Sequence, residues 1–193
     1  MRTGSPGGGQ AMESFETLRI KNTNVNQAAD VSLSPRQQIL VGSVLDLFEG
    51  HPTLGKLALW NPAGLFKDPL AYAEGYDRFA AQWYGLAALF GPIHIQSHQV
   101  TSAENPIELS LSNKYVVKGV GIERTINSVV RIHVNPDGRI EQVEDRWNDQ
   151  LPEGGIGEFF RKLNAKMVPA FVTVPKTEAD DRKMEASRES AGG

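Results

Sequence analysis

The sequence predicts an α+β fold in which helices pack on one face of a curved antiparallel sheet. Two helical segments come first, at about 34–50 and 70–90, and a run of long alternating strands follows them. The segment 122–148 predicts two antiparallel strands joined by the tight turn Pro136-Asp137-Gly138. Helices followed by consecutive strands are typical of α+β proteins.

The composition is that of one domain. The chain has 193 residues, no cysteine and a formal net charge of −3. Disulfides and thiol catalysis are therefore excluded, and a reducing, cytoplasmic location is expected. The mild acidity without a basic patch predicts no nucleic-acid partner. The longest apolar run, at 79–90, is too short to cross a membrane.

We expect a largely disordered tail over 1–33, one domain over 34–175 and a disordered tail over 176–193. The first tail begins Gly/Ser/Pro-rich, and the last is charged and built of small residues. A C-terminal helix is expected within the domain, over 156–167.

The first helix has clear start and stop signals. Ser34 is the expected N-cap, Pro35 occupies the first helical position and Gln37 completes a capping box. Gly50 ends the helix. The apolar residues between them predict one buried face: Ile39, Leu40, Val44, Leu47 and Phe48.

The second helix, expected from about Leu70 to Phe90, has an aromatic stripe at spacings of three and four. It consists of Tyr72, Tyr76, Phe79, Trp83, Leu86 and Phe90. The stripe is either the wall of a pocket for a flat apolar ligand or ordinary packing of helix on sheet. Tyr76 and Trp83 matter most, because each has a polar tip that needs a partner.

Asp145 is the least expected residue of the hairpin, since it shares a strand face with Val143 and Trp147. Desolvation would raise its pKa and make it an acid or base near neutrality. The alternative is a structural carboxylate that pairs with a backbone amide or with an arginine: Arg124, Arg131 or Arg146. Asp68 precedes Pro69, and Asp-Pro pairs commonly cap helices.

No metal site is predicted. His94 and His98 share a strand face but lie roughly 13 Å apart along it, which is too far for one metal ion. The chain also has no nucleophile elbow, phosphate-binding loop or complete dinucleotide-binding glycine motif. No cofactor is expected.

The order helix, F-x-D-P, aromatic helix and strands ending in G-R-I-x-x-V-x-D-x-W resembles the nuclear-transport-factor-two-like superfamily. The ending D-x-W-N resembles fungal SnoaL-like proteins within it. The resemblance spans about 34–150 and implies a cone-like sheet with helices on its concave face. Cone-shaped members include polyketide cyclases, ketosteroid isomerase and scytalone dehydratase.

The resemblance also implies site residues. Asp68 matches the general base of ketosteroid isomerase. The tyrosine and the protonated aspartate of that enzyme fall near Ser43 and Val130 here. In the SnoaL-like cyclases the acid/base aspartate follows the tryptophan, where this chain has Asn148.

Two functions follow as hypotheses. The first is a cofactor-independent cyclase, isomerase or dehydratase of a small apolar substrate. Its catalytic groups would be Asp145 and Asp68, and Tyr76, Trp83 and Trp147 would surround the substrate. The second is a non-catalytic ligand-binding or dimerising scaffold, with Val129, Arg131 and His133 in a homodimer interface.

Overall fold

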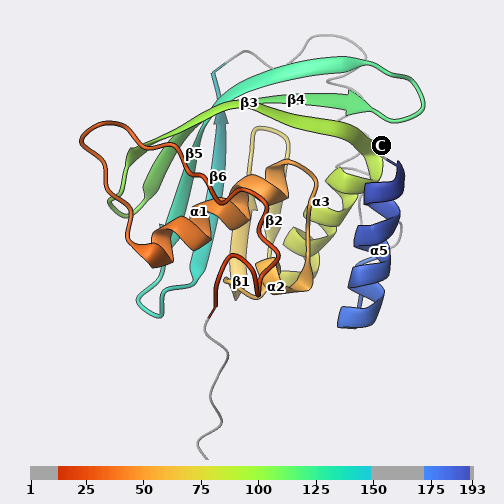
Figure 1. The fold of residues 1–193 in the computed structure, drawn as a ribbon, viewed down its shortest axis with the longest axis horizontal. Helices are drawn as coiled ribbons and strands as arrows, with labels where there is room; N and C mark the ends of the chain where they lie inside the picture. Colours follow the sequence, from red (N-terminus) through yellow and green to blue (C-terminus); the bar gives the residue numbers. More distant parts are fainter. Residues whose placement is uncertain (1–12, 149–171, 192–193) are drawn as a thin grey trace, which may run out of the picture.

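The computed structural model describes residues 13–148 and 172–191. A six-stranded open sheet, in the order β2-β1-β6-β5-β4-β3, curves around two helices (Figure 1). The elements are α1 (Pro35–Phe48), α2 (Leu54–Leu57), β1 (Trp60–Lys67), β2 (Tyr72–Glu74), α3 (Tyr76–Leu89), β3 (Phe90–Ser102), β4 (Ile107–Val117), β5 (Glu123–Val134), β6 (Ile140–Trp147) and α5 (Glu178–Ala191). The predicted α+β fold is confirmed.

The predicted hairpin is formed by β5 and β6. Gly138 adopts φ 75°, and its N–H donates to the carbonyl of Asn135 in the turn. A positive φ costs glycine little, because it has no Cβ. Burial alternates along β5 as expected, with Ile126, Val130 and Ile132 inside.

The sheet is mixed, whereas the sequence predicts an antiparallel one. β1 runs parallel to β6, with Phe66 beside Val143 and Lys67 beside Glu144. The other strand pairs are antiparallel. The two strands of the parallel pair are far apart in the chain, so no turn between them could reveal their direction.

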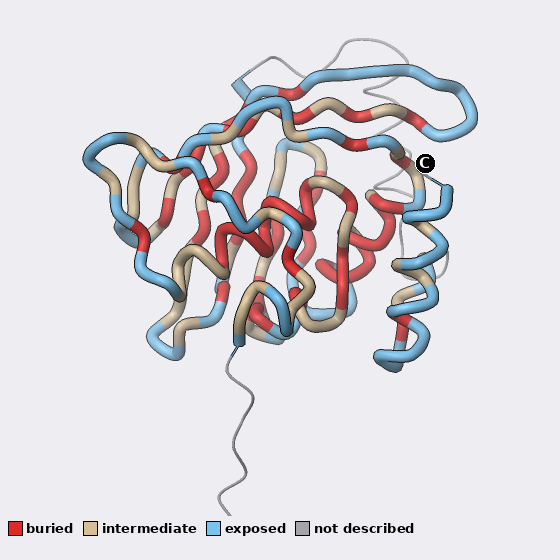
Figure 2. The backbone as a smooth tube through the Cα atoms, viewed as in Figure 1, coloured by how far each residue is buried: buried red, intermediate tan, exposed pale blue. Residues whose placement is uncertain are grey.

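Helix α1 begins as predicted and packs on the concave face together with α3 (Figure 1). The Ser34 hydroxyl accepts from the N–H of Gln37, whose side chain accepts from the N–H of Ser34. This reciprocal cap satisfies two otherwise unpaired donors. Figure 2 shows the buried stretches of α1 and α3 facing the sheet, where they form the main core.

Helix α3 begins at Tyr76 and not at Leu70. The segment Tyr72–Glu74 forms β2 and pairs with β1, which removes Tyr72 from the expected stripe. Gly75 then turns the chain with φ 86°. Helical spacing alone does not show where a helix starts, because a short strand can precede it with the same residues.

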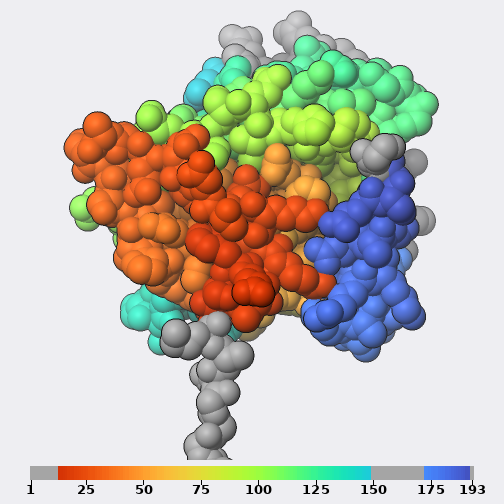
Figure 3. All heavy atoms as spheres, viewed as in Figure 1, coloured from red at the N-terminus to blue at the C-terminus, as the bar shows by residue number. Residues whose placement is uncertain are grey.

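The segment 13–33 is ordered against the domain, contrary to the expected tail. Ile20 and Val25 are buried, and Gln27 bridges to Val100 of β3. The segment lies across α1 and reaches α5 (Figure 3). Its polar composition hid this role, because its few apolar residues, such as Val25 and Leu33, are scattered along it and still reach the core.

A buried ion pair joins this segment to two helices. Asp46 of α1 and Lys56 of α2 lie 2.6 Å apart with fully buried side chains. The carboxylate of Asp46 also accepts from the backbone N–H groups of Lys21 and Asn22, both at 2.9 Å. Lys56 donates to the carbonyl of His51 at 2.8 Å. The charges are therefore bonded as well as paired, as burial demands.

Residues 178–191 form α5, where the sequence predicts a disordered tail. The helix is mostly exposed (Figure 2), and its one fully buried residue, Asp181, anchors it. Asp181 accepts from Tyr84 at 2.6 Å, from Arg19 at 2.9 Å and from the N–H of Leu54 at 3.0 Å. The helix predicted over 156–167 lies outside the described residues. None of the helices described is long and apolar enough to cross a membrane.

Candidate functional site

Asp145 projects from β6 into the concave side, as its alternation predicts. It is 6% exposed, and its Oδ2 accepts from the indole Nε1 of Trp147 at 2.9 Å. Burial raises the pKa of Asp145 to about 6, opposed by the nearby Ser128 hydroxyl and by the Trp147 indole. The other oxygen, Oδ1, has no hydrogen-bond partner of normal geometry among the described residues. Such an oxygen is available to a ligand or a water molecule.

Asp68 lies in the turn between β1 and β2. Its Oδ1 accepts from the N–H groups of Leu70 and Ala71, at 2.7 and 2.5 Å. The expected cap of a helix at Pro69 is therefore wrong: Asp68 caps a turn. Burial raises the pKa of Asp68 to about 7, although the two amides lower it; the charge of Asp145 raises it further.

The parallel pairing of β1 with β6 brings these two carboxyl groups together. Lys67, the last residue of β1, lies beside Glu144, and Asp68 and Asp145 directly follow these two residues; the charge of Asp145 raises the pKa of Asp68. Both residues follow a buried neighbour by two positions, Phe66 and Val143, and so share the concave side. The ionised form of one carboxyl group disfavours ionisation of the other. The sequence proposes both residues, and the effect of the Asp145 charge on Asp68 shows that the two carboxyl groups interact.

Two more polar residues, Tyr115 and Asn113 of β4, lie near the two carboxyl groups and form a polar strip with them. Sequence reasoning missed both. The Nδ2 of Asn113 donates to the Tyr115 hydroxyl at 2.9 Å and to the carbonyl of Phe48 at 2.8 Å. Burial raises the pKa of Tyr115, and the charges of Asp145 and Asp68 raise it further. The hydroxyl therefore stays protonated and can donate. Period-two alternation along β4 was the available signal, since it places both on the face of Leu111.

Trp83 forms the helical wall above the strip. It is 2% exposed and packs against Phe66 and Phe48, with ring centroids 4.6 and 5.2 Å away. Its Nε1 has no hydrogen-bond partner among the residues described. Trp83 therefore lies where the sequence predicts it, and it offers an unused donor.

The other two residues expected to contact the substrate, Trp147 and Tyr76, lie in different surroundings. Trp147 lies at the end of β6 beside Asp145, which it contacts directly. Tyr76 is 36% exposed at the first turn of α3 and packs edge-on against Phe79. Because α3 starts at Tyr76, its first turn lies at the surface and not above the carboxyl groups.

The positions implied by the resemblance can now be located. Ser43 is buried in α1 and donates to the carbonyl of Leu40. Val130 pairs directly with Asp145 across β5 and β6. Val130 occupies the position of the protonated aspartate of ketosteroid isomerase. In this chain a carboxyl group, that of Asp145, lies on the neighbouring strand directly beside that position. Within the described ranges, no three potential ligands group as a metal site would require.

Comparison with known proteins gives a likeness of structure. No protein-family model matches the chain, and no curated protein matches its sequence. A steroid delta-isomerase from Pseudomonas aeruginosa matches with a TM-score of 0.52 and 17% identity, over 73% of this chain and 100% of that one.

Two further solved structures are more distant. A ketosteroid isomerase-like fold from Catenulispora acidiphila, in complex with trimethylamine, has a TM-score of 0.48 and 13% identity over 55% of this chain and 82% of that one. A protein of unknown function from Exiguobacterium has a TM-score of 0.47 and 15% identity over 57% of this chain and 99% of that one. At such identities the likeness is one of fold.

Proposed function

We propose that this chain, which has the nuclear-transport-factor-two-like fold, is a cofactor-independent isomerase, dehydratase or cyclase of a small apolar molecule. One observation carries the proposal: two enclosed carboxyl groups lie together and have pKa values near neutrality, about 7 for Asp68 and about 6 for Asp145. Pairs of this kind supply an acid and a base at one pH.

The pKa order assigns the roles. The charge of Asp145 raises the pKa of Asp68, so Asp68 holds its proton where Asp145 is the carboxylate. Asp145 would take a proton from a carbon next to a carbonyl group, and Asp68 would return one at another atom. An isomerisation then needs no co-reactant, and a dehydration releases water. Asp145 ends protonated and Asp68 ionised, so a proton must pass from Asp145 to Asp68, directly or through water, before the next turnover.

Tyr115 supports the same chemistry. Its hydroxyl accepts from Asn113, so its own hydrogen remains available to an oxygen that gains negative charge. A neutral donor in an enclosed place stabilises an enolate more effectively than one in water. The aromatic wall of Trp83, Phe48 and Phe66 favours an apolar substrate body.

A non-catalytic ligand-binding role is the second candidate, and one observation favours it. Trp83 is almost fully buried against Phe48 and Phe66, so a ligand would need this wall to move. A carrier could hold its ligand through Asp145 without transferring a proton.

Proton abstraction can be tested before the substrate is known. The full chain is incubated in D₂O with a panel of cyclic and unsaturated ketones, and deuterium uptake at carbon is followed by mass spectrometry. We expect the wild type to accelerate exchange on at least one ketone, and Asp145→Asn to abolish it. An amide keeps the shape of the carboxylate but does not accept a proton at neutral pH.

Glu144→Gln is the matched control. Glu144 is the adjacent carboxylate of β6, points to the other face and pairs with Arg146 and Lys67. It should leave exchange unchanged. Ligands that raise the melting temperature without any exchange would support the carrier. Exchange that survives in Asp145→Asn would refute the assigned base.

A further inference from the structure

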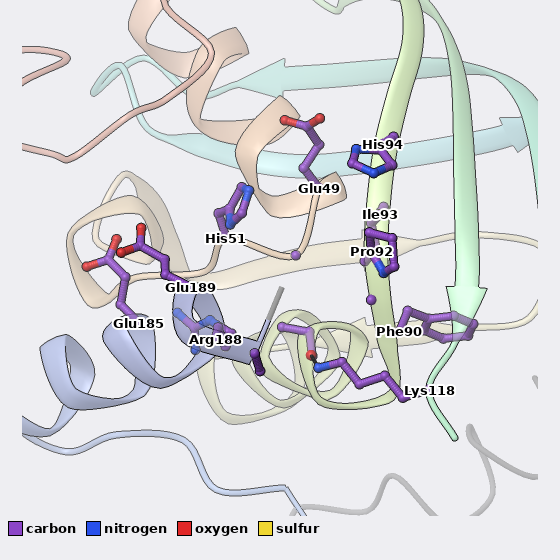
Figure 4. Close-up of a pocket in the computed structure, with 14 residues that line it drawn as sticks. Glu49, His51, Phe90, Pro92, Ile93, His94, Lys118, Glu185, Arg188 and Glu189 are labelled. Carbon is purple, nitrogen blue, oxygen red and sulfur yellow. Dashed lines mark hydrogen bonds between the residues drawn. The ribbon is translucent and has the colours of Figure 1, made fainter. Parts of the chain in front are cut away.

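A cavity of about 600 Å³ lies between the C-terminal helix α5, the end of α3 and the start of β3 (Figure 4). Its walls come from the end of α1, the end of α3, the start of β3 and the last turns of α5. The cavity has the size of a small-molecule site. None of the residues assigned above to proton transfer lines it.

Two cations face this cavity without a carboxylate partner. Lys118 donates to the carbonyl of Ala87 at 2.7 Å, and Arg188 donates to the carbonyl of Pro52 at 2.9 Å. Neither forms an ion pair with any residue in the described ranges. The Nε of Arg188 is buried without a hydrogen-bond partner there. Burial and the charge of Arg188 lower the pKa of Lys118, which shows that the two cations are close enough to repel each other.

The carboxylates in the wall are, in contrast, already bonded. Glu185 pairs with Arg19 at 2.6 Å, and Glu189 pairs with Lys21 at 2.7 Å. Glu49 accepts from the side chain of Asn22 at 2.8 Å and from the N–H of Ile95 at 3.2 Å. Glu185 and Glu189 are therefore paired with cations outside the cavity, although both also attract Arg188; Lys118 has no ion-pair partner among the described residues.

The remaining wall is apolar or neutral. Phe90, Pro92 and Ile93 of β3 line one side (Figure 4). Burial and the charge of Lys21 lower the pKa of His51, opposed by Asp46, so His51 is neutral at pH 7 and can donate or accept. An apolar floor with two converging cations suits a ligand that has an anionic head and an apolar body.

We propose that this cavity binds a small organic anion whose oxyanion lies between Lys118 and Arg188 and whose apolar part rests on Phe90 and Ile93. The oxyanion is a carboxylate or a phosphate monoester, because both offer oxygens to the guanidinium fork and to the ammonium group. The anion replaces the repulsion between the cations with two charge-assisted hydrogen bonds. This site goes beyond the proposed function and does not depend on it.

The test is titration of the full chain with benzoate and with phenyl phosphate, followed by calorimetry and by NMR of the histidine rings. Benzyl alcohol serves as the uncharged analogue. We expect at least one anion to bind, benzyl alcohol not to bind, and the ring signals of His51 and His94 to shift. The two anions distinguish a carboxylate site from a phosphate site.

Variants locate the binding. Lys118→Gln and Arg188→Gln should each weaken binding about tenfold, the loss typical of one charge-assisted hydrogen bond. Lys114→Gln on β4 and Arg182→Gln on α5 make the same change outside the cavity and should bind like the wild type. Asp145→Asn should also bind normally, which separates this site from the proposed catalytic one.

Arg188 also holds α5 through Pro52, so Arg188→Gln could loosen the helix. Lys118→Gln decides the question by itself. Within the described residues, the Lys118 side chain donates only to the carbonyl of Ala87, and the backbone bond of Lys118 to Leu89 is unaffected by the change. The proposal is overturned if neither anion binds at about 10 mM, a concentration that detects affinities down to the millimolar range. Equal binding of benzyl alcohol, or unchanged affinity in Lys118→Gln, overturns it as well.

Discussion

The indole of Trp147 donates a 2.9 Å hydrogen bond to Asp145 from the same face of β6. No arginine takes that place. Arg131 pairs with Glu108 at 2.5 Å, Arg146 pairs with Glu144 at 3.1 Å, and Arg124 is exposed. Among the described residues, Asp145 is thus a buried carboxyl group held by neutral donors, and removing its charge leaves none of their cations unpaired.

Asp145→Asn should therefore stabilise the protein at neutral pH. Burial raises the pKa of Asp145 from 3.8 to about 6, so the folded state keeps a proton that the unfolded state has lost. This contribution is complete below about pH 4 and is lost as the pH rises through about 6. The variant, neutral throughout, should gain about 3 kcal/mol of unfolding free energy at pH 7.5.

Urea unfolding at pH 4 and pH 7.5 measures this gain, which should vanish at pH 4. Glu144→Gln provides a control of opposite sign. Burial raises the pKa of Glu144, but Arg146 and Lys67 outweigh it and lower the pKa overall, so neutralisation should cost a little stability at pH 7.5. A stability loss in Asp145→Asn at pH 7.5 would show an unrecognised cationic partner.

The pH dependence of turnover should be bell-shaped, with a maximum between pH 6 and 7. Asp145 must be ionised and Asp68 protonated, and their pKa values of about 6 and about 7 set the two limbs. Deuterium exchange measured from pH 5 to 8 gives the profile. Asp68→Asn should lower the rate and remove the alkaline limb; an unchanged profile in that variant would exclude Asp68 as the acid.

Lys56→Met should destabilise the fold by about 3 kcal/mol, because it leaves the charge of Asp46 buried without its cation. Chemical unfolding measures the loss. Lys67→Met is the control: Lys67 is exposed, and its 3.5 Å pair with Glu144 should contribute less than about 1 kcal/mol. The double change Asp46→Leu with Lys56→Met should not restore stability, since the amides of Lys21 and Asn22 then lack an acceptor.

Asp181→Asn should loosen α5. The carboxylate of Asp181 accepts from Tyr84, Arg19 and the N–H of Leu54. A neutral amide weakens most the bonds to Tyr84 and Arg19, which depend on the charge of the carboxylate. Faster hydrogen exchange over 178–191 is the expected readout. Lys183→Gln, two residues later and exposed, should change exchange little. Equal protection in both variants would mean that Asp181 does not anchor the helix.

A homodimer through the outer face of β5 stays a prediction. Val129, Arg131 and His133 lie half-buried there, and the Nε2 of His133 has no hydrogen-bond partner among the described residues. Val129→Asp should weaken dimerisation at least about tenfold in sedimentation equilibrium, because it buries a charge at the contact. Glu74→Lys on the exposed strand β2 is the control. A wild type that is monomeric at high micromolar concentration would dispose of this interface.

The sequence by itself determined the local features. The cap at Ser34, the turn at Gly138 and the inward direction of Asp145 all follow from hydrogen bonding and backbone geometry within a few residues. Periodicity carries such information because neighbouring residues share one strand or helix.

Only the tertiary structure decided the rest. The parallel pairing of two distant strands brings Asp68 within the electrostatic reach of Asp145, and both charges act on Tyr115 of β4. Helix α5, which has no apolar stripe, is held by the buried carboxylate of Asp181. These contacts join residues far apart in the chain, and their free energy comes from burial and polar pairing that exist only once the sheet and helices have packed.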